Sequence, residues 1–205
     1  MIIKYKNKKI IFVHIQKCGG TSVLKFFKNK KNHNKIKDDI KYLKNKKENI
    51  NNYFKFTIVR NPWDRIVSFY HYHKQKLIKG IVVSNTWKYI KNLKFHDFLK
   101  SHQFQKWASR NNIVDYITYK DKIYIDYFIN FEKLKDDFEI IKKIADKHGV
   151  LPVTNKSKHH NYEKYYDKKS KKIISDLFQR EINFFNFKFG KKINLKNINK
   201  NIILD

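Results

Sequence analysis

The chain has 205 residues, 41% hydrophobic and 16% aromatic, which is enough for a packed core and excludes a wholly disordered protein. No apolar run approaches the roughly 20 residues that a membrane-spanning helix needs. The formal net charge of +29 fits a polyanionic partner. Lysine supplies nearly all of this charge and is enriched together with asparagine and isoleucine, so compositional bias is the preferred explanation, and incidental polyanion binding is expected either way.

The first predicted strand covers the apolar run 10–13, after an N-terminus, MIIKYKNKK, that does not resemble a secretory signal. The single cysteine, Cys18, excludes an intrachain disulfide and fits a reducing compartment. We therefore expect a cytoplasmic or otherwise intracellular protein without a membrane span. One domain is expected over residues 1–190, followed by a basic C-terminal tail over residues 191–205 that frays.

A glycine-containing loop follows this strand in the stretch HIQKCGGTS. Backbone N–H groups at a helix N-terminus, glycines and hydroxyl groups together bind phosphate, and Lys17 adds a positive charge. In the Walker pattern the lysine follows the glycines, whereas here it precedes them. No acidic strand end for Mg²⁺ is apparent. The loop predicts a phosphate site without a metal, and a glycine-rich turn with an incidental lysine is the structural alternative.

A second strand is predicted over residues 53–60, after a polar segment in which Ile36, Ile40 and Leu43 share one face of a short helix. Asn61 is a suitable N-cap and Pro62 a suitable first helical residue, so a helix should begin there. Two consecutive strand–loop–helix units predict a parallel sheet with helices on its faces. Further along the chain we expect helices over residues 95–102, 105–110, 132–149 and 167–182, and a strand over residues 122–131.

Arg60 lies at the carboxyl end of the second strand, where open α/β sheets bind ligands, and its guanidinium can clamp a phosphate. Ser68, two turns into the next helix, can donate to the same group. An Arg60 surface ion pair and a solvent-facing Ser68 are the structural alternatives. Two anion sites, each after a buried strand, indicate one ligand with two separated phosphate groups.

HIQKCGGTS followed by FTIVRNPWDRIVSFYHYH resembles the family-2 sulfotransferases, the group that includes carbohydrate sulfotransferases. HIQK is similar to the heparan sulfate 6-O-sulfotransferase branch. With FINFEKLKDDF, NKSKHHNYEKYYD and FQREINFFNFKF, the resemblance covers most of residues 8–190. It implies an α/β, P-loop-like three-layer fold with a central parallel sheet flanked by helices. It also implies sulfuryl transfer from 3′-phosphoadenosine 5′-phosphosulfate (PAPS) to a hydroxyl acceptor, expected on a carbohydrate, with 3′-phosphoadenosine 5′-phosphate (PAP) as product and no metal.

The resemblance further implies how the nucleotide is held. Arg60 and Ser68 would bind the 3′-phosphate, and a late loop with Lys156 and Ser157 would close over the nucleotide. The first loop would bind the 5′-phosphosulfate, with Lys17 also catalytic, through the residues Lys17, Cys18, Gly19, Gly20, Thr21 and Ser22.

A general base must take the proton of the acceptor. His33 is the first choice, because NHNKIKDDIKYL resembles the histidine-containing helix start of small family members, although an exposed histidine among lysines is nearly as reasonable an interpretation. His14, which follows an apolar strand, is expected to be a packed residue or one that supports a residue of the site. His71 and His73 are expected to line the helix or contact the acceptor, and His159 and His160 belong to the late loop over the nucleotide. The carboxylate alternatives are Asp38 and Asp39, for which a charged helix face is the favoured interpretation.

Two other functions stay open at this point. A P-loop-type small-molecule or nucleotide kinase would share the fold but would want the Walker lysine and a magnesium carboxylate. A non-enzymatic nucleic-acid-binding protein would use the +29 charge directly. The identity of the acceptor and the oligomeric state do not follow from the sequence.

Overall fold

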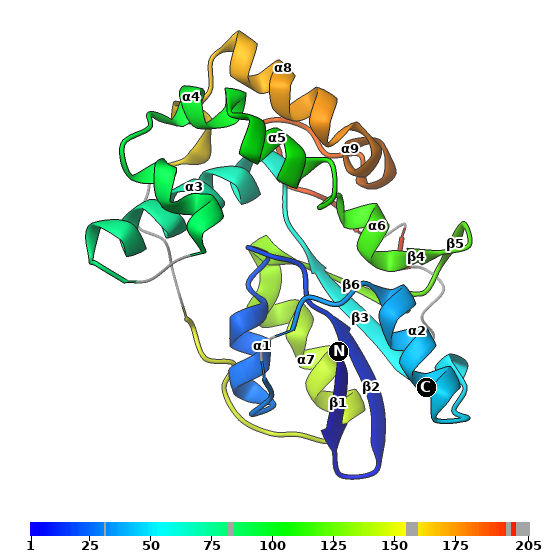
Figure 1. Cartoon of the computed structure of the whole chain (residues 1–205). Helices are drawn as coiled ribbons and strands as arrows, with labels where there is room; N and C mark the ends of the chain where they lie inside the picture. The colour runs from blue at the N-terminus through cyan, green and yellow to red at the C-terminus, as the bar shows by residue number, and fades with distance from the viewer. Residues whose placement is uncertain (31, 82–83, 155–159, 196–197, 200–205) are drawn as a thin grey trace. The chain divides into compact units, whose positions relative to one another are not determined.

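The computed structural model describes residues 1–30, 32–81, 84–154, 160–195 and 198–199 (Figure 1). The chain divides into two compact units. The sheet unit comprises Met1–Arg60, Ile113–Asn155 and Ile193–Asp205, and the helical unit comprises Asn61–Asn112 and Lys156–Lys192. The chain passes from the first unit to the second between Arg60 and Asn61, inside the predicted second loop. A single domain over residues 1–190 stays a prediction.

The sheet unit is built on four strands in the order β1-β2-β3-β6 (Figure 1). Their bounds are β1 Ile2–Tyr5, β2 Lys8–Val13, β3 Phe54–Val59 and β6 Tyr127–Asn130. β2, β3 and β6 run parallel, with Phe12 opposite Phe56 and Phe56 opposite Tyr127. β1, which the sequence analysis did not anticipate, pairs antiparallel with β2. The carboxyl ends of three neighbouring parallel strands therefore lie at one edge of the sheet.

Aromatic side chains form the core beside this sheet. The rings of Phe12 and Phe56 stack with centroids 4.9 Å apart, and Phe138 packs edge-on against Phe26 at 5.3 Å. Phe26 ends helix α1 (Gly20–Phe26) and Phe138 lies in helix α7 (Leu134–Ala145), so these two helices lie side by side, as Figure 1 shows. Each such buried side chain contributes about 1.5–3 kcal/mol. The predicted α/β class, with a mostly parallel sheet flanked by helices, is confirmed.

The smaller elements of the sheet unit follow local signals. Helix α2 (Ile36–Asn45) buries Ile36 and Leu43 on the face that their spacing predicts. Between β3 and β6 along the chain, in this unit, come α6 (Ile113–Ile117), β4 (Thr118–Tyr119) and β5 (Lys122–Ile123), the last two forming a small hairpin. Two 3-10 turns complete the unit, η1 (Ile50–Asn52) and η3 (Phe131–Lys133).

The strand predicted over residues 122–131 is wrong as one element, because it is divided into β5 and β6. Asp126 causes the division. Its backbone N–H donates to the Lys55 carbonyl at 2.7 Å, and its carboxylate accepts from the Lys55 backbone N–H at 2.7 Å. Its carboxylate also pairs with the buried Lys55 ammonium at 2.8 Å. The Asp126 carboxylate thus takes the hydrogen bond of the Lys55 N–H that a backbone carbonyl would accept in a continued strand, and β6 begins only at Tyr127.

The regular elements described in the helical unit are helices (Figure 1). Asn61 accepts a hydrogen bond from the Trp63 N–H at 3.1 Å, so the long helix α3 (Pro62–Ile78) begins at the predicted cap. Asp167 caps α8 (Lys168–Leu177) as predicted, but the chain turns at Phe178 and continues as a separate helix, α9 (Gln179–Phe185). The remaining elements are η2 (Asn85–Lys91), α4 (Phe95–Lys100), α5 (His102–Ala108) and η4 (Tyr162–Tyr165).

Part of the C-terminal tail is attached to β6. The Asn199 side-chain amide donates to the Phe128 carbonyl at 2.9 Å, and its oxygen accepts from the Phe128 N–H at 3.0 Å. The Asn130 side chain donates to the Ile193 carbonyl at 3.3 Å. These bonds satisfy backbone groups of the outer strand. Residues 200–205, where the tail is predicted to fray, lie outside the described residues.

Candidate active site

The loop between β2 and α1 turns through two left-handed residues. Lys17 has a φ of 64° and Gly19 a φ of 82°. A side chain at Gly19 would also lack space, because an added Cβ would lie 3.1 Å from Leu134 Cδ2 and from Phe131 Cε2. The loop after β2 is therefore packed tightly against the residues that follow β6. Gly19 is required there for its conformation and for its size.

His14 covers the start of α1. A Cβ added to Gly20 would lie 2.2 Å from His14 Cδ2, so the imidazole rests directly on the glycine backbone. Only 3% of His14 is exposed. The prediction that His14 is a packed residue agrees with this position, and the second glycine of the motif gives the ring its room.

Arg60 joins the two loops that the sequence singles out. Its Nη1 donates to the Lys17 carbonyl at 2.8 Å, and its guanidinium carbon lies 4.0 Å from the centroid of the Phe131 ring. Arg60 itself is 7% exposed. Arg60, which directly follows β3, thus contacts both the backbone of the loop after β2 and the ring of Phe131, which directly follows β6. The bond to the Lys17 carbonyl places the cationic residues Lys17 and Arg60 next to each other.

The other first-loop residues differ in their surroundings. The Ser22 hydroxyl lies 3.3 Å from the hydroxyl of Thr154, a residue of the late loop that sequence reasoning did not single out. Thr21 is half-buried. The Cys18 thiol is buried and donates to the Gln16 carbonyl at 3.7 Å, as expected of a structural cysteine. Thr21 and Ser22 supply hydroxyl donors beside Lys17, the donor set that suits an anion.

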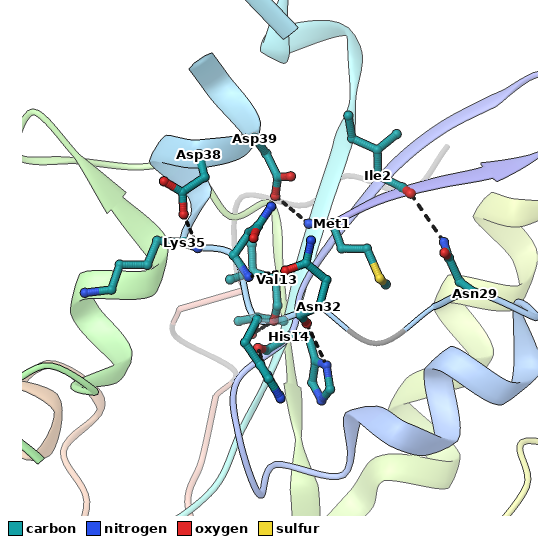
Figure 2. A network of polar contacts seen from close by, with 12 residues as sticks. Met1, Ile2, Val13, His14, Asn29, Asn32, Lys35, Asp38 and Asp39 are labelled. Carbon is teal, nitrogen blue, oxygen red and sulfur yellow. Dashed lines mark hydrogen bonds and ion pairs between the residues drawn. The ribbon is translucent and has the colours of Figure 1, made fainter. Parts of the chain in front are cut away.

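The His33 ring lies against the His14 ring in a tilted arrangement. The ring centroids lie 4.2 Å apart, and His33 Nδ1 hydrogen-bonds to the His14 carbonyl at 3.0 Å. In return, His14 Nδ1 hydrogen-bonds to the Asn32 carbonyl at 3.0 Å, the contact drawn in Figure 2. The structure therefore places the predicted base half-buried at the end of β2, beside the first loop.

The two carboxylate alternatives have structural partners (Figure 2). Asp38 accepts from the Lys35 N–H at 2.9 Å, which caps α2, and the buried Asp39 forms an ion pair with the Met1 amine. Both carboxylates therefore have structural partners, and Asp39 is buried rather than part of an exposed charged face.

The remaining candidates belong to the helical unit or are not described. Ser68, on α3, is 2% exposed. Arg60 and Ser68 belong to different units, so the phosphate that they are predicted to share stays a prediction.

The histidines of α3 have contacts that suit helix-lining residues: His73 Nδ1 donates to the Phe69 carbonyl at 2.9 Å, and the His71 ring packs 4.8 Å from the Tyr165 ring. The His160 N–H donates to the Tyr165 hydroxyl at 3.3 Å. Three predicted late-loop residues lie outside the described residues: Lys156, Ser157 and His159.

Neither a metal site nor a membrane-spanning helix appears in the parts of the chain that the structure describes. Within them, no three His, Cys, Asp or Glu side chains gather as a metal-binding group. Within the same residues, no helix combines the length and the hydropathy needed to cross a bilayer.

Comparison with known proteins gives two matches in sequence. Residues 1–188 match the Sulfotransferase family. The chain is also 30% identical to carbohydrate sulfotransferase 10 of Xenopus laevis in an alignment 181 residues long, and this alignment covers 69% of this chain and 49% of that protein. The chain thus spans about half the length of this relative. No solved structure shows a significant match.

The predicted cytoplasmic location is wrong. Homologues of carbohydrate sulfotransferase 10 are Golgi membrane-type enzymes. The prediction depended on the lack of a leader or membrane segment in these 205 residues. Since they correspond to about half of the relative, that lack carries no information about the compartment.

Proposed function

Because the chain belongs to the sulfotransferase family, we propose that it transfers a sulfuryl group from PAPS to a hydroxyl group of a carbohydrate. The family uses PAPS as its donor. Carbohydrate as the acceptor class is supported by the name of the 30% identical relative. The activity as a whole is a proposal, because the chain spans only 49% of that relative.

The observation that carries the proposal is the bond from Arg60 to the Lys17 carbonyl. It brings together two loops whose residues each suit a phosphate, at the carboxyl ends of adjacent parallel strands. PAPS carries two separated anionic groups, the 5′-phosphosulfate and the 3′-phosphate. One bound molecule would therefore use both loops, whereas a single phosphate ion would need only one.

In the proposed mechanism, PAPS supplies an activated sulfuryl group whose bond to the 5′-phosphate breaks as the acceptor oxygen attacks. Lys17, Thr21 and Ser22 would hold the 5′ side, and the lysine charge would stabilise the negative charge that develops on the leaving phosphate. Arg60 and Ser68 would bind the 3′-phosphate and so align the nucleotide. Lys156 and Ser157 would close over it. His33 would take the proton of the acceptor hydroxyl.

The first test compares ligands by thermal unfolding. PAP at ~100 times its Kd should add roughly 2.7 kcal/mol of stability, whereas ATP with Mg²⁺ should add much less. Stabilisation by ATP with Mg²⁺ and none by PAP would instead favour a kinase. Transfer of labelled sulfate from PAPS to a panel of glycans then tests the acceptor class, and sulfation of only non-carbohydrate hydroxyls would contradict it.

A further inference from the structure

We propose that His14 is a positioning residue that fixes the tautomer and the orientation of His33. The inference rests on the proposed function, in which His33 is the base. It adds a second histidine, whose side chain acts on the reaction only through the first. Four contacts carry it, all within the sheet unit: two hydrogen bonds, a tilted ring contact and the approach of His14 to Gly20.

The two hydrogen bonds are reciprocal. The His14 backbone carbonyl accepts from His33, and the His14 ring donates to the carbonyl of Asn32, the residue directly before His33. Both nitrogen–oxygen distances are 3.0 Å. The segment that carries the base is thus attached to the end of β2 at two consecutive residues. A rotation of the His33 ring would require at least its own bond to His14 to break.

The chemistry of the carbonyl decides the tautomer of His33. A carbonyl oxygen only accepts hydrogen bonds, so the nitrogen facing it, Nδ1, must carry the proton. In a neutral imidazole the other nitrogen then has a lone pair. His33 is therefore held with Nε2 as its basic atom. When it acts, the acceptor O–H bond breaks, an Nε2–H bond forms, and the positive imidazolium strengthens its bond to the His14 carbonyl.

The His14 ring also gives His33 a fixed platform. It contacts the tilted ring of His33, at a centroid distance of 4.2 Å, and stacks on Phe12, at 5.5 Å and nearly parallel. Its edge rests on Gly20, where an added Cβ would be 2.2 Å away. Gly20 opens the helix that follows the phosphate-binding loop. His14 thus contacts both the helix start after the first loop, at Gly20, and the proposed base, His33.

Two substitutions separate the parts of this role. His14→Phe keeps a ring on the stack but removes the donor to Asn32. His14→Asn removes the ring but places an N–H at the position of Nδ1, so it restores the bond. His148→Phe, at an exposed residue of the same unit, is the matched control. We expect His14→Phe to lower kcat about 10- to 100-fold, the usual effect of losing an orienting partner. KM for PAPS should stay constant, His14→Asn should recover part of kcat, and His148→Phe should match wild type.

The decisive readout is the tautomer of His33, measured by ¹⁵N–¹H correlation NMR in the full chain. Wild type should show Nδ1–H with an unprotonated Nε2, His14→Phe should show a mixture of tautomers, and His14→Asn should return toward wild type. A wild-type His33 protonated at Nε2 would overturn the inference. So would a His14→Phe variant with unchanged kcat and an unchanged spectrum. If His14→Phe does not fold, the spectrum of His14→Asn decides, since loss of the Nδ1–H tautomer there contradicts the role of the bond.

The same measurements separate this inference from the proposed function. The tautomer is visible whether or not PAPS is a substrate, so a chain without sulfotransferase activity can still show the predicted spectrum. Conversely, full activity of His33→Ala together with PAP binding would remove His33 as the base. His14 would then have no base to position, and the inference would fail while the proposed function stood.

Discussion

Arg60 and Arg65 lie in one short motif, RNPWDR, and both are buried, but they have different environments. Arg65, on α3 in the helical unit, donates from Nη2 to Glu181 at 2.7 Å and from Nη1 to the Asn111 carbonyl at 3.2 Å. Arg65 is 1% exposed and Glu181 is 0% exposed. Arg60, which ends the first segment of the sheet unit, donates to the Lys17 carbonyl and lies on the Phe131 ring.

Because both arginines are buried, burial does not by itself indicate a ligand site. Arg65 connects α3 to α9 through a buried carboxylate, and both of its terminal nitrogens have partners inside the helical unit. Arg60 instead lies at the edge of the sheet where three parallel strands end, and its backbone partner is Lys17 in the loop between β2 and α1. The position in the sheet and the kind of partner, rather than burial, distinguish a candidate binding residue from a structural one.

The largest expected effect belongs to the structural arginine. Arg65→Met should lower the free energy of unfolding by about 3–5 kcal/mol, because it leaves Glu181 buried without its cation. Denaturant unfolding monitored by circular dichroism measures the change. The double variant Arg65→Met with Glu181→Leu should recover most of the loss, since a buried pair replaced by apolar residues is close to neutral. An Arg65→Met variant as stable as wild type would show that the Arg65–Glu181 pair does not hold α3 and α9 together.

For the first loop we expect a loss of activity instead. Lys17→Ala should reduce sulfate transfer by about 10²–10³ in kcat, because it removes the charge that stabilises the leaving phosphate. Lys25→Ala is the matched control, since Lys25 is exposed on α1. Both variants should unfold like wild type. A fully active Lys17→Ala enzyme would contradict the proposed mechanism.

Substitutions of Arg60 should lower both the binding of PAP and the rate of transfer. Arg60→Ala should abolish stabilisation by PAP and most transfer, because it removes a phosphate clamp and the bond to the Lys17 carbonyl together. Arg60→Lys keeps the charge but not the planar fork, so its affinity for PAP should also fall, as isothermal titration calorimetry can measure. Wild-type affinity in Arg60→Lys would mean that only the charge matters.

His33→Ala should lower kcat by about 10², the contribution of a general base, while binding of PAP is retained. Steady-state kinetics with His102→Ala as the exposed control measures it. Unchanged turnover in His33→Ala would assign the proton transfer to another histidine.

Local signals in the sequence predicted much of the fold. The Asn61–Pro62 cap, the Asp167 cap and the spacing of Ile36 and Leu43 involve neighbours in sequence, and each element begins or faces as they indicate. The pairing of the two loops could be anticipated because parallel strands place their carboxyl ends together.

The parts that could not be predicted depend on long-range bonds between side chains and backbone. Asp126 divides a strand by binding Lys55, 71 positions away, and Arg60 reaches a carbonyl 43 positions away. Periodicity and capping contain no trace of such contacts. Phe131 was missed as a partner of Arg60, although its place directly after a strand was a usable signal. The ring contact between His14 and His33 likewise forms only when Asn32 and the end of β2 meet.

The smallest expected effect concerns pH in the unit that contains Arg60. Tyr127, on β6, is 8% exposed, and burial, with a further contribution from Asp137, raises the pKa of its hydroxyl from 10.0 to about 12. The folded state therefore holds this proton more tightly than the unfolded state. The associated stability is complete below pH 10 and is lost as the pH rises from 10 through 12.

Tyr127→Phe removes this group from the titration. Wild type should lose about 1 kcal/mol more than Tyr127→Phe between pH 9 and pH 11, since one pKa unit corresponds to about 1.4 kcal/mol. Urea unfolding at a series of pH values measures both slopes, and Tyr42→Phe, at a half-exposed tyrosine of α2, is the control. Equal slopes for wild type and Tyr127→Phe would show that the start of β6, the outer strand of the sheet, opens to solvent.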